Sequence, residues 1–280
     1  MRLKRITLAT ALVSALLTAG TVALPAAQAA PAGSGGLADA AAAVDAAKVG
    51  GTAWGKDAKG RLKVTADATV SAAGLAKLRN ATAKYGDSVT IERAAGVFKP
   101  LLSAGDAIYG GGYRCSLGFN VVKGGVYYFL TAGHCGGVVG TWYADGGQST
   151  LVGPTVNASF PGNDYALVRY DNASVSHPGG FTVAEPFVGE SVTRRGSTTG
   201  THTGTVTALN TTVHYSSGET VRGLIQTNVC AESGDSGGAL YDGTKALGLT
   251  SGGSGNCQVG GTTFYQPVRE AVNKYKVTIY

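Results

Sequence analysis

The stretch Asn228–Leu240 reads NVCAESGDSGGAL and places one serine, Ser236, in the run GDSGG (234–238). A serine hydroxyl becomes an effective nucleophile only when a neighbouring base takes its proton. Acyl transfer also needs two backbone N–H groups that converge on the developing oxyanion, and flanking glycines allow so tight a turn. Because the chain has 44 glycines among its 280 residues, an ordinary Gly/Ser turn is the alternative that the partners of Ser236 must exclude.

The region after residue 101 offers four histidines as a base for Ser236. His134 lies in LTAGHC (130–135), where an apolar strand ends beside a cysteine that holds the backbone. The other three lie in a Ser-His-Pro-Gly loop or in Thr-rich strands, which favours structural roles for His177, His202 and His214. His134 is therefore the candidate base.

A carboxylate must orient the imidazole and stabilise its cation. Asp164, in NDYALV (163–168), lies where a polar turn enters an apolar strand, a place where an acid can be partly buried. Asp235 adjoins Ser236 but would point away from an exposed serine. The other candidates lie in Gly- or Asn-rich loops, where we expect them to be solvated: Asp106, Asp145, Asp171 and Asp242.

The N-terminus predicts export. Basic residues at positions 2, 4 and 5 precede an apolar run over 6–24 and the small-x-small sequence AQA at 27–29, which is typical of a secretory signal peptide over 1–29. No second apolar segment follows, so we expect a secreted, extracellular protein that has no membrane partner. Oxidising compartments favour disulfides, and four cysteines allow three connectivities, of which the sequential one closes two short loops: Cys115, Cys135, Cys230 and Cys257.

The charge distribution argues against a nucleic-acid partner. Residues 1–101 carry 13 Lys and Arg against 6 Asp and Glu, whereas residues 102–280 carry 10 against 11. The basic excess behind the net charge of +6 therefore lies wholly in the N-terminal part. Cysteine and histidine spacings typical of zinc sites are absent, and we expect no metal and no cofactor.

Composition divides the chain near residue 101. Residues 30–101 mix helix and strand: the pattern predicts helices over 37–49 and from an N-cap at Ser71 to Gly86, and strands over 61–66 and 88–93. Residues 102–280 consist of short alternating runs broken by Gly and Asn, which indicate an all-β barrel or sandwich with one helix over 267–276.

The runs TAGHC, NDYALV and GDSGG, in that order, resemble the chymotrypsin-like serine proteases. The runs RCSLGFN (114–120), RGSTTG (195–200) and LTSGGSGNC (249–257) are similar to the secreted actinomycete branch, the streptogrisins. The resemblance covers essentially all of 102–280. It implies two six-stranded antiparallel β-barrels with a short C-terminal helix, preceded by a small α/β pro-region, and a secreted serine endopeptidase whose site lies between the barrels.

The resemblance also implies a role for each residue. His134 is the general base and acid, Asp164 orients it, Ser236 is the nucleophile, and the N–H groups of Gly234 and Ser236 form the oxyanion hole. The substrate-binding set is Ser251, Gly252, Gly253 and Thr263, of which the first three pair with an extended peptide. In animal members of the family, the N-terminal amine freed by processing is buried against the acid that precedes the nucleophile. The sequence LSAG (102–105) at the start of this region does not fit that arrangement. Asp235 therefore needs another cation. By resemblance to the bacterial branch this is Arg194, with a solvated arginine pair at 194 and 195 as the alternative.

Specificity follows from the pocket that accepts the residue before the scissile bond. By the same resemblance, the residues before Cys230 form the pocket floor; these are Asn228 and Val229, so we expect no carboxylate there and place Glu232 near the rim. Thr250 stands where the glutamate-specific relatives carry a histidine. We therefore expect cleavage after Phe, Tyr or Leu, whose burial contributes roughly 1.5–3 kcal/mol each.

The resemblance to the bacterial branch implies a self-processing pre-pro-protein. Residues 30–101 would assist folding of the protease domain, 102–280, and then be removed by a cut between Leu101 and Leu102. We expect the junction 98–105 to be an exposed strand rather than core. The mature enzyme would be a monomer that binds polypeptide substrates, its own pro-region and a proteinaceous inhibitor.

Two other functions compete with this one. A catalytically inactive homologue that serves as a peptide-binding module would usually have lost a member of the triad, and all three are present. An α/β-hydrolase esterase needs G-x-S-x-G, which GDSGG (234–238) matches as text. That fold orders its triad as serine, acid, histidine, the reverse of the order found here.

Overall fold

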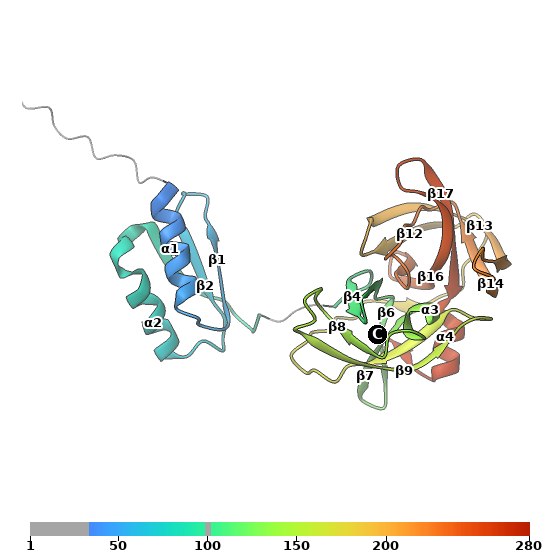
Figure 1. Ribbon diagram of the computed structural model, residues 1–280, viewed down its shortest axis with the longest axis horizontal. Coiled ribbons are helices and arrows are strands. Elements are labelled where there is room, and N and C mark those ends of the chain that lie inside the picture. The colour runs from blue at the N-terminus through green and yellow to red at the C-terminus, as the bar shows by residue number, and fades with distance from the viewer. Residues whose placement is uncertain (1–33, 99–101) are drawn as a thin grey trace, which may run out of the picture. The chain divides into compact units, whose positions relative to one another are not determined.

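The structure, a computed structural model, describes residues 34–98 and 102–280, which form two compact units divided after Val97 (Figure 1). The predicted signal peptide over 1–29, and Leu101 on one side of the predicted cut, lie outside the described residues. Among the residues that are described, no helix has the length and apolar character needed to cross a membrane.

The first unit folds around a three-stranded sheet in which β1 and β2 are antiparallel and β2 and β3 are parallel. Two helices pack on the sheet through an apolar cluster that includes Val44, Val64 and Leu78. The Ser71 hydroxyl accepts from the Gly74 N–H and so caps α2 as predicted. The mixed helix and strand content is confirmed, in the elements α1 (Ser34–Ala46), β1 (Thr52–Lys56), β2 (Leu62–Ala66), α2 (Ala72–Thr82), a 3₁₀ helix (Ala83–Ser88) and β3 (Val89–Arg93).

The second unit begins with an eight-stranded antiparallel sheet in the order β18-β6-β7-β10-β9-β8-β4-β5. Two of its strands bury runs of consecutive residues, Phe119–Val121 and Tyr165–Val168. A single-turn helix, α3 (Gly133–Gly136), follows β7 directly. The strands are β4 (Ala107–Gly110), β5 (Tyr113–Ser116), β6 (Phe119–Lys123), β7 (Val126–Thr131), β8 (Thr141–Tyr143), β9 (Leu151–Ser159), β10 (Tyr165–Arg169) and β18 (Thr278–Ile279).

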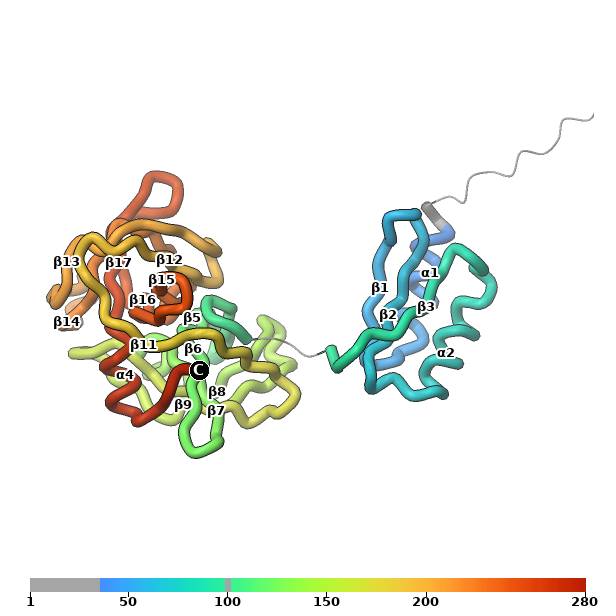
Figure 2. Tube along the Cα trace, turned by 180° about the vertical axis from the view of Figure 1, so that it is seen from behind, coloured from blue at the N-terminus to red at the C-terminus, as the bar shows by residue number. Residues whose placement is uncertain are grey.

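The second sheet closes on itself because β16 pairs with β17 as well as with β15. Six strands form the closed barrel, and the two-residue strand β11 adds to β16 in parallel. The strand β11 lies in the segment that connects the two barrels, which can be followed in Figure 2. The strands are β11 (Thr182–Val183), β12 (Ser191–Gly196), β13 (Gly200–His214), β14 (Thr220–Thr227), β15 (Ala239–Asp242), β16 (Lys245–Asn256) and β17 (Gly260–Pro267).

The two-barrel, mostly β fold is therefore confirmed. The closed second barrel has the six strands predicted, apart from the added β11, whereas the first sheet has eight strands. A short C-terminal helix, α4 (Val268–Tyr275), is present as predicted, and it buries Val268, Ala271 and Tyr275. One apolar cluster joins α4 to residues of both barrels, among them Phe119 and Leu249. From α4 the chain returns to the first barrel, where β18 pairs with β6. This shared core fixes the barrels against one another and so positions the groove between them.

The start of the region predicted to be a protease domain, 102–280, departs from the sequence prediction. Leu102 is only 2% exposed and packs in the core of the first barrel, and Ala104 is also buried. The Leu102 N–H donates to the Ser176 carbonyl, and the Asn120 amide donates to the Leu102 carbonyl. The prediction of an exposed strand at this junction is wrong for these residues, because an apolar side chain at 102 completes the core.

Candidate active site

His134 lies on α3, just after the end of β7. Cys115 and Cys135 form a disulfide that ties the helix to β5, and Gly133 packs so closely against Ser159 and Tyr165 that a side chain there would clash. The His134 side chain remains 30% exposed. The local sequence therefore holds the backbone rigidly while the imidazole faces the groove.

Asp164 lies immediately before β10 and is fully buried. Its Oδ1 accepts from the His134 N–H at 2.8 Å, and its Oδ2 lies 2.9 Å from His134 Nδ1. An ionised carboxylate can only accept hydrogen bonds, so Nδ1 carries the proton and Nε2 is left as an acceptor. This is the tautomer that a general base needs.

Two opposing effects set the pKa of His134. Burial favours the neutral imidazole and would lower the pKa, whereas the hydrogen bond to Asp164 and the negative charge of that carboxylate favour the cation. The contribution of Asp164 prevails, and the pKa of His134 lies above its ordinary value. Asp164 thus makes the imidazole a stronger base than it would be alone.

A hydrogen-bonded chain extends from Asp164 into the second barrel. The Ser251 hydroxyl donates to Asp164 Oδ2 at 2.6 Å, so its oxygen is free to accept from the Tyr215 hydroxyl 2.8 Å away. The Asp164 N–H donates to Gln266 Oε1 at 2.7 Å. Sequence reasoning selected Ser251 only for its backbone and did not find Tyr215 or Gln266. No local signal marks them, because they lie 51 and 102 residues away from Asp164 along the chain.

Ser236 lies in the loop between β14 and β15. Gly234 and Gly237 flank it at φ values of +96° and +83°, in the left-handed region that favours glycine. Among the described residues, neither the Gly234 nor the Ser236 N–H donates a hydrogen bond, which leaves both able to bind an oxyanion. No hydrogen bond joins Ser236 Oγ to His134 within the described structure.

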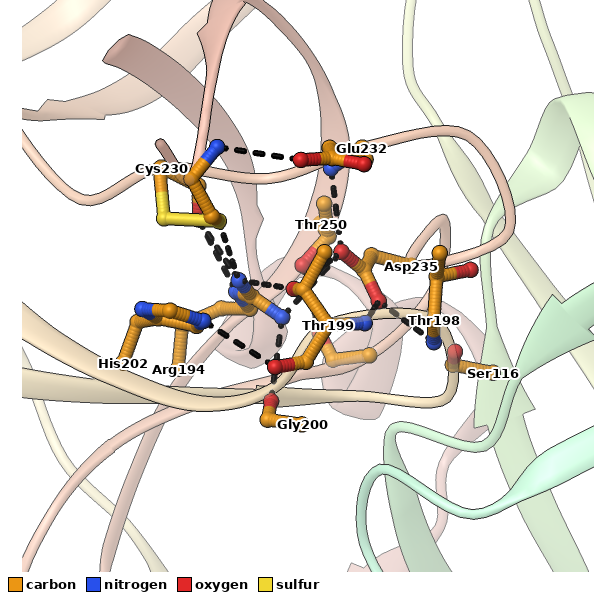
Figure 3. A network of polar contacts seen from close by, with 12 residues as sticks. Ser116, Arg194, Thr198, Thr199, Gly200, His202, Cys230, Glu232, Asp235 and Thr250 are labelled. Atoms are coloured by element: carbon orange, nitrogen blue, oxygen red, sulfur yellow. Dashed lines mark hydrogen bonds and ion pairs between the residues drawn. A yellow bond between two sulfur atoms is a disulfide. The ribbon is translucent and has the colours of Figure 1, made fainter. Parts of the chain in front are cut away.

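Asp235, the residue before Ser236, belongs to a buried network of polar contacts with Arg194 (Figure 3). Arg194 Nη1 lies 3.2 Å from Asp235 Oδ2, and both side chains are fully buried. Asp235 also accepts from the backbone N–H groups of Thr198, Thr199 and Glu232. Burial opposes ionisation, but these hydrogen bonds and Arg194 outweigh it and hold the pKa of Asp235 below its usual value.

Strand alternation decides which of the two neighbouring arginines is buried. Arg194 faces the barrel interior, where it also donates to the Cys230 carbonyl. Arg195 faces outward and pairs with Asp106. The two arginines are therefore not a solvated pair, and the cysteine beside Arg194 belongs to the second disulfide, Cys230–Cys257.

Two cavities flank the strand segment Gly252–Gly253, which lines both of them. One, of about 230 Å³, is also lined by Ser236, Glu232 and Thr250. The other, of about 370 Å³, is also lined by His134, Phe160 and Tyr215. A side chain at position 252 would clash with the Tyr215 ring, and one at 253 would clash with the Thr262 carbonyl.

The remaining candidates lie as follows. Glu232 is exposed at the rim, where its carboxylate accepts from the Cys257 N–H. Thr263 is fully buried and donates to the Val229 carbonyl, so its side chain lies behind Gly253 and lines neither cavity.

The other histidines contact structural partners. His177 contacts the Tyr280 hydroxyl, His202 contacts the Thr199 carbonyl, and His214 contacts the Thr220 hydroxyl. His202 and the sulfurs of Cys230 and Cys257 lie within 4.8 Å of one another. Because the two sulfurs are joined in a disulfide, they cannot act as thiolate ligands for a metal.

The sequence model of the family described as Trypsin matches residues 109–275. Streptogrisin-A of Streptomyces griseus is 50% identical over 254 residues, which cover 87% of this chain and 83% of that protein. Glutamyl endopeptidase 2 of the same organism is 46% identical over 186 residues, 63% of this chain and 98% of that protein. A crystal structure of Cellulomonas bogoriensis chymotrypsin, 46% identical, superimposes with a TM-score of 0.56 over 64% of this chain and 98% of that one.

Proposed function

The chain belongs to the trypsin family of chymotrypsin-like serine proteases, and from that membership we propose that it is a secreted endopeptidase that cleaves polypeptides after large apolar residues. The observation that carries the proposal is the buried Asp164 carboxylate. It holds the proton on His134 Nδ1 and so leaves Nε2 as a base beside a cavity that shares Gly252 and Gly253 with the cavity of Ser236.

The reaction proceeds through an acyl-enzyme. His134 Nε2 takes the proton of the Ser236 hydroxyl as the oxygen attacks the peptide carbonyl, and the N–H groups of Gly234 and Ser236 stabilise the oxyanion. His134 then gives the proton to the leaving amine, and the peptide C–N bond breaks. Water, deprotonated by the same imidazole, hydrolyses the ester and restores Ser236.

The alternative, an inactive peptide-binding module, makes a different prediction for Ser236. A fluorophosphonate labels only a serine that a base activates. We expect it to label Ser236 in the secreted wild-type protein, which should also digest casein, and we expect Ser236→Ala to do neither. A folded wild-type protein that binds peptides but resists the label and leaves casein intact would establish the alternative.

We propose that the residue before the scissile bond is apolar, and the charges of the cavity beside Ser236 support this. Its described lining contains no cation to pair with glutamate, and its one acid, Glu232, is exposed and already accepts a hydrogen bond. An unpaired charge that enters it would lose hydration without compensation. Among peptide anilides that differ at this residue alone, Phe, Tyr or Leu should exceed Lys, Arg and Glu by about 100-fold in kcat/KM. A preference for Lys or Glu would refute the assignment.

We also propose the order signal peptide 1–29, pro-region 30–101 and protease 102–280, with Ser236 of the same chain making the cut after Leu101. The burial of Leu102 implies that the cut precedes its final packing, because a bond next to a core residue cannot enter the active site. Secreted Ser236→Ala should therefore keep an N-terminus near residue 30 in a host without extracellular proteases. An N-terminus at Leu102 in that variant would assign the cut to another enzyme.

The proposed partners follow from the same site. The mature protease would act as a monomer, and a proteinaceous inhibitor would occupy the strand edge at Ser251–Gly253 in place of substrate. The freed pro-region would be its other partner. Refolding of 102–280 with and without 30–101 supplied separately tests that role, because an all-β domain with mostly non-local contacts folds slowly unaided.

A further inference from the structure

The larger of the two cavities carries a negative charge that the reaction does not use. Glu219 lines it from the hairpin between β13 and β14, where the Tyr215 N–H donates to the Glu219 carbonyl. Within the described lining, Glu219 is the one carboxylic acid and His134 is the one side chain that can become a cation near neutral pH. The aromatic side chains of Phe160 and Tyr215 complete the walls.

The Glu219 carboxylate is ionised and incompletely paired. The Ser217 hydroxyl and the backbone N–H of Glu219 itself hold the pKa of this carboxyl below its usual range. Its Oε2 is buried yet has no hydrogen-bond partner among the described residues, and no described cationic side chain forms an ion pair with it. Since unpaired buried acceptors cost free energy, the carboxylate would gain from a cation supplied through the cavity.

The position of the cavity says which part of a substrate would supply that cation. A peptide paired with Ser251–Gly253 is extended, so neighbouring side chains point to opposite faces. The residue before the scissile bond enters the cavity that contains Ser236. The next residue toward the N-terminus then faces the cavity that contains His134 and Glu219.

We propose that this cavity selects a lysine or arginine side chain at the second residue before the scissile bond, with Glu219 as the residue that recognises its charge. The inference rests on the proposed peptidase function. The aliphatic part of the side chain packs against Phe160 and Tyr215, and the cationic end reaches the Glu219 carboxylate. The enzyme therefore selects an apolar side chain at the first residue before the scissile bond and a basic side chain at the second.

The experiment uses the secreted enzyme obtained from the full chain and peptide anilides with phenylalanine before the scissile bond. The second residue is either lysine or norleucine, which has a similar length and no charge. The ratio of their kcat/KM values should be about fivefold in favour of lysine, the effect of a moderately screened ion pair, and should fall as salt rises. Taking the ratio within each variant cancels any loss of folding or catalysis that affects both substrates.

Variants separate the charge of Glu219 from other effects. Glu219→Gln should bring the ratio close to one, and Glu219→Lys should make glutamate better than glutamine at the same substrate position. Glu232→Gln, which alters the acid at the other cavity, should leave the lysine ratio as it is. A wild-type ratio near one, a ratio unchanged by Glu219→Gln, or a preference that appears only at the fourth residue would each overturn the proposal. Failure to cleave any of the anilides would instead contradict the proposed peptidase function.

Discussion

Asp164 in the first barrel and Asp235 in the second are both fully buried carboxylates, each paired with a cationic or protonatable side chain. Asp164 pairs with His134, which is partly exposed to the groove, whereas Asp235 pairs with Arg194, which is buried completely. An imidazole gains and loses its proton near neutral pH, but a guanidinium stays charged throughout. The first pair can therefore take part in each turnover, and the second can only hold the loop that carries Ser236.

The same substitution at the two sites should separate these roles. Asp164→Asn should lower kcat/KM by about 10⁴-fold, because the amide can donate to Nδ1 and then stabilises the wrong imidazole tautomer. The protein should still fold, since the amide is close in size to the carboxylate. Steady-state kinetics and thermal unfolding measure both quantities. Asp171→Asn, at an exposed acid after β10, is the control and should change neither.

If Asp164→Asn kept more than a tenth of wild-type activity, His134 would not depend on this carboxylate for its tautomer. The Asp164–His134 pair would then have no catalytic role that distinguishes it from the Asp235–Arg194 pair.

At the second site the larger effect should be on stability. Asp235→Asn leaves the buried Arg194 guanidinium without its counter-charge, and breaking a buried ion pair typically costs about 3–5 kcal/mol of unfolding free energy. Chemical denaturation of the purified protease measures the change. Arg195→Gln, which removes the neighbouring exposed ion pair with Asp106, should cost less than about 1 kcal/mol. Equal losses for the two variants would show that burial does not distinguish the arginines.

The pH dependence sharpens the same contrast. Activity should rise with pH as His134 loses its proton, with a midpoint above about 6.5, because Asp164 raises the pKa of the imidazole. Because the pKa of His134 is raised in the folded state, its protonation stabilises the fold at pH values below the pKa of the unfolded state. That stabilisation is lost as the pH rises through the folded-state pKa. Asp235 has a lowered pKa, so its contribution is present above about pH 4 and is lost only as pH falls through the folded value.

Between about pH 7 and 5 the enzyme should therefore lose activity reversibly while its melting temperature stays level or rises. Parallel measurements of kcat/KM and thermal unfolding across this range check the prediction. A melting temperature that falls together with activity would mean that the acid limb reports unfolding rather than titration of His134.

The sequence predicted features that depend on local pattern. Alternating strands, the Ser71 cap and the helix that buries Val268 and Ala271 follow from side chains a few residues apart, and the structure contains them. The strand β1 was missed because four of its five residues are exposed and the run TAWGK lacks an alternating pattern. Propensity identifies an edge strand of this kind poorly, since pairing with β2 rather than its own burial holds it in place.

Features that depend on distant contacts could not be read from the sequence. Leu102 is next to a glycine- and serine-containing run, and nothing local reveals that Ser176 and Asn120 hold it in the core. Tyr215 is one of 13 tyrosines, and its contact with Ser251 depends on a hairpin that folds over β16. Site residues that lie in a single motif could be predicted from the sequence, whereas contacts between the two barrels could not.

Tyr215 provides the smallest of the expected effects and the finest test of the first pair. Its hydroxyl donates to Ser251, which in turn donates to Asp164, so the second barrel stabilises the charge that orients His134. Tyr215→Phe removes this donor and should lower kcat/KM by about fivefold, the value of one neutral hydrogen bond near 1 kcal/mol. With Ser251 a weaker donor, Asp164 keeps more of its negative charge, so the pH midpoint of activity should move upward by a fraction of a unit. Tyr113→Phe, at an exposed tyrosine of the first barrel, is the control. A fivefold loss with no movement of the midpoint would place Tyr215 in the wall of the substrate cavity alone, and would separate it from the pair that it contacts.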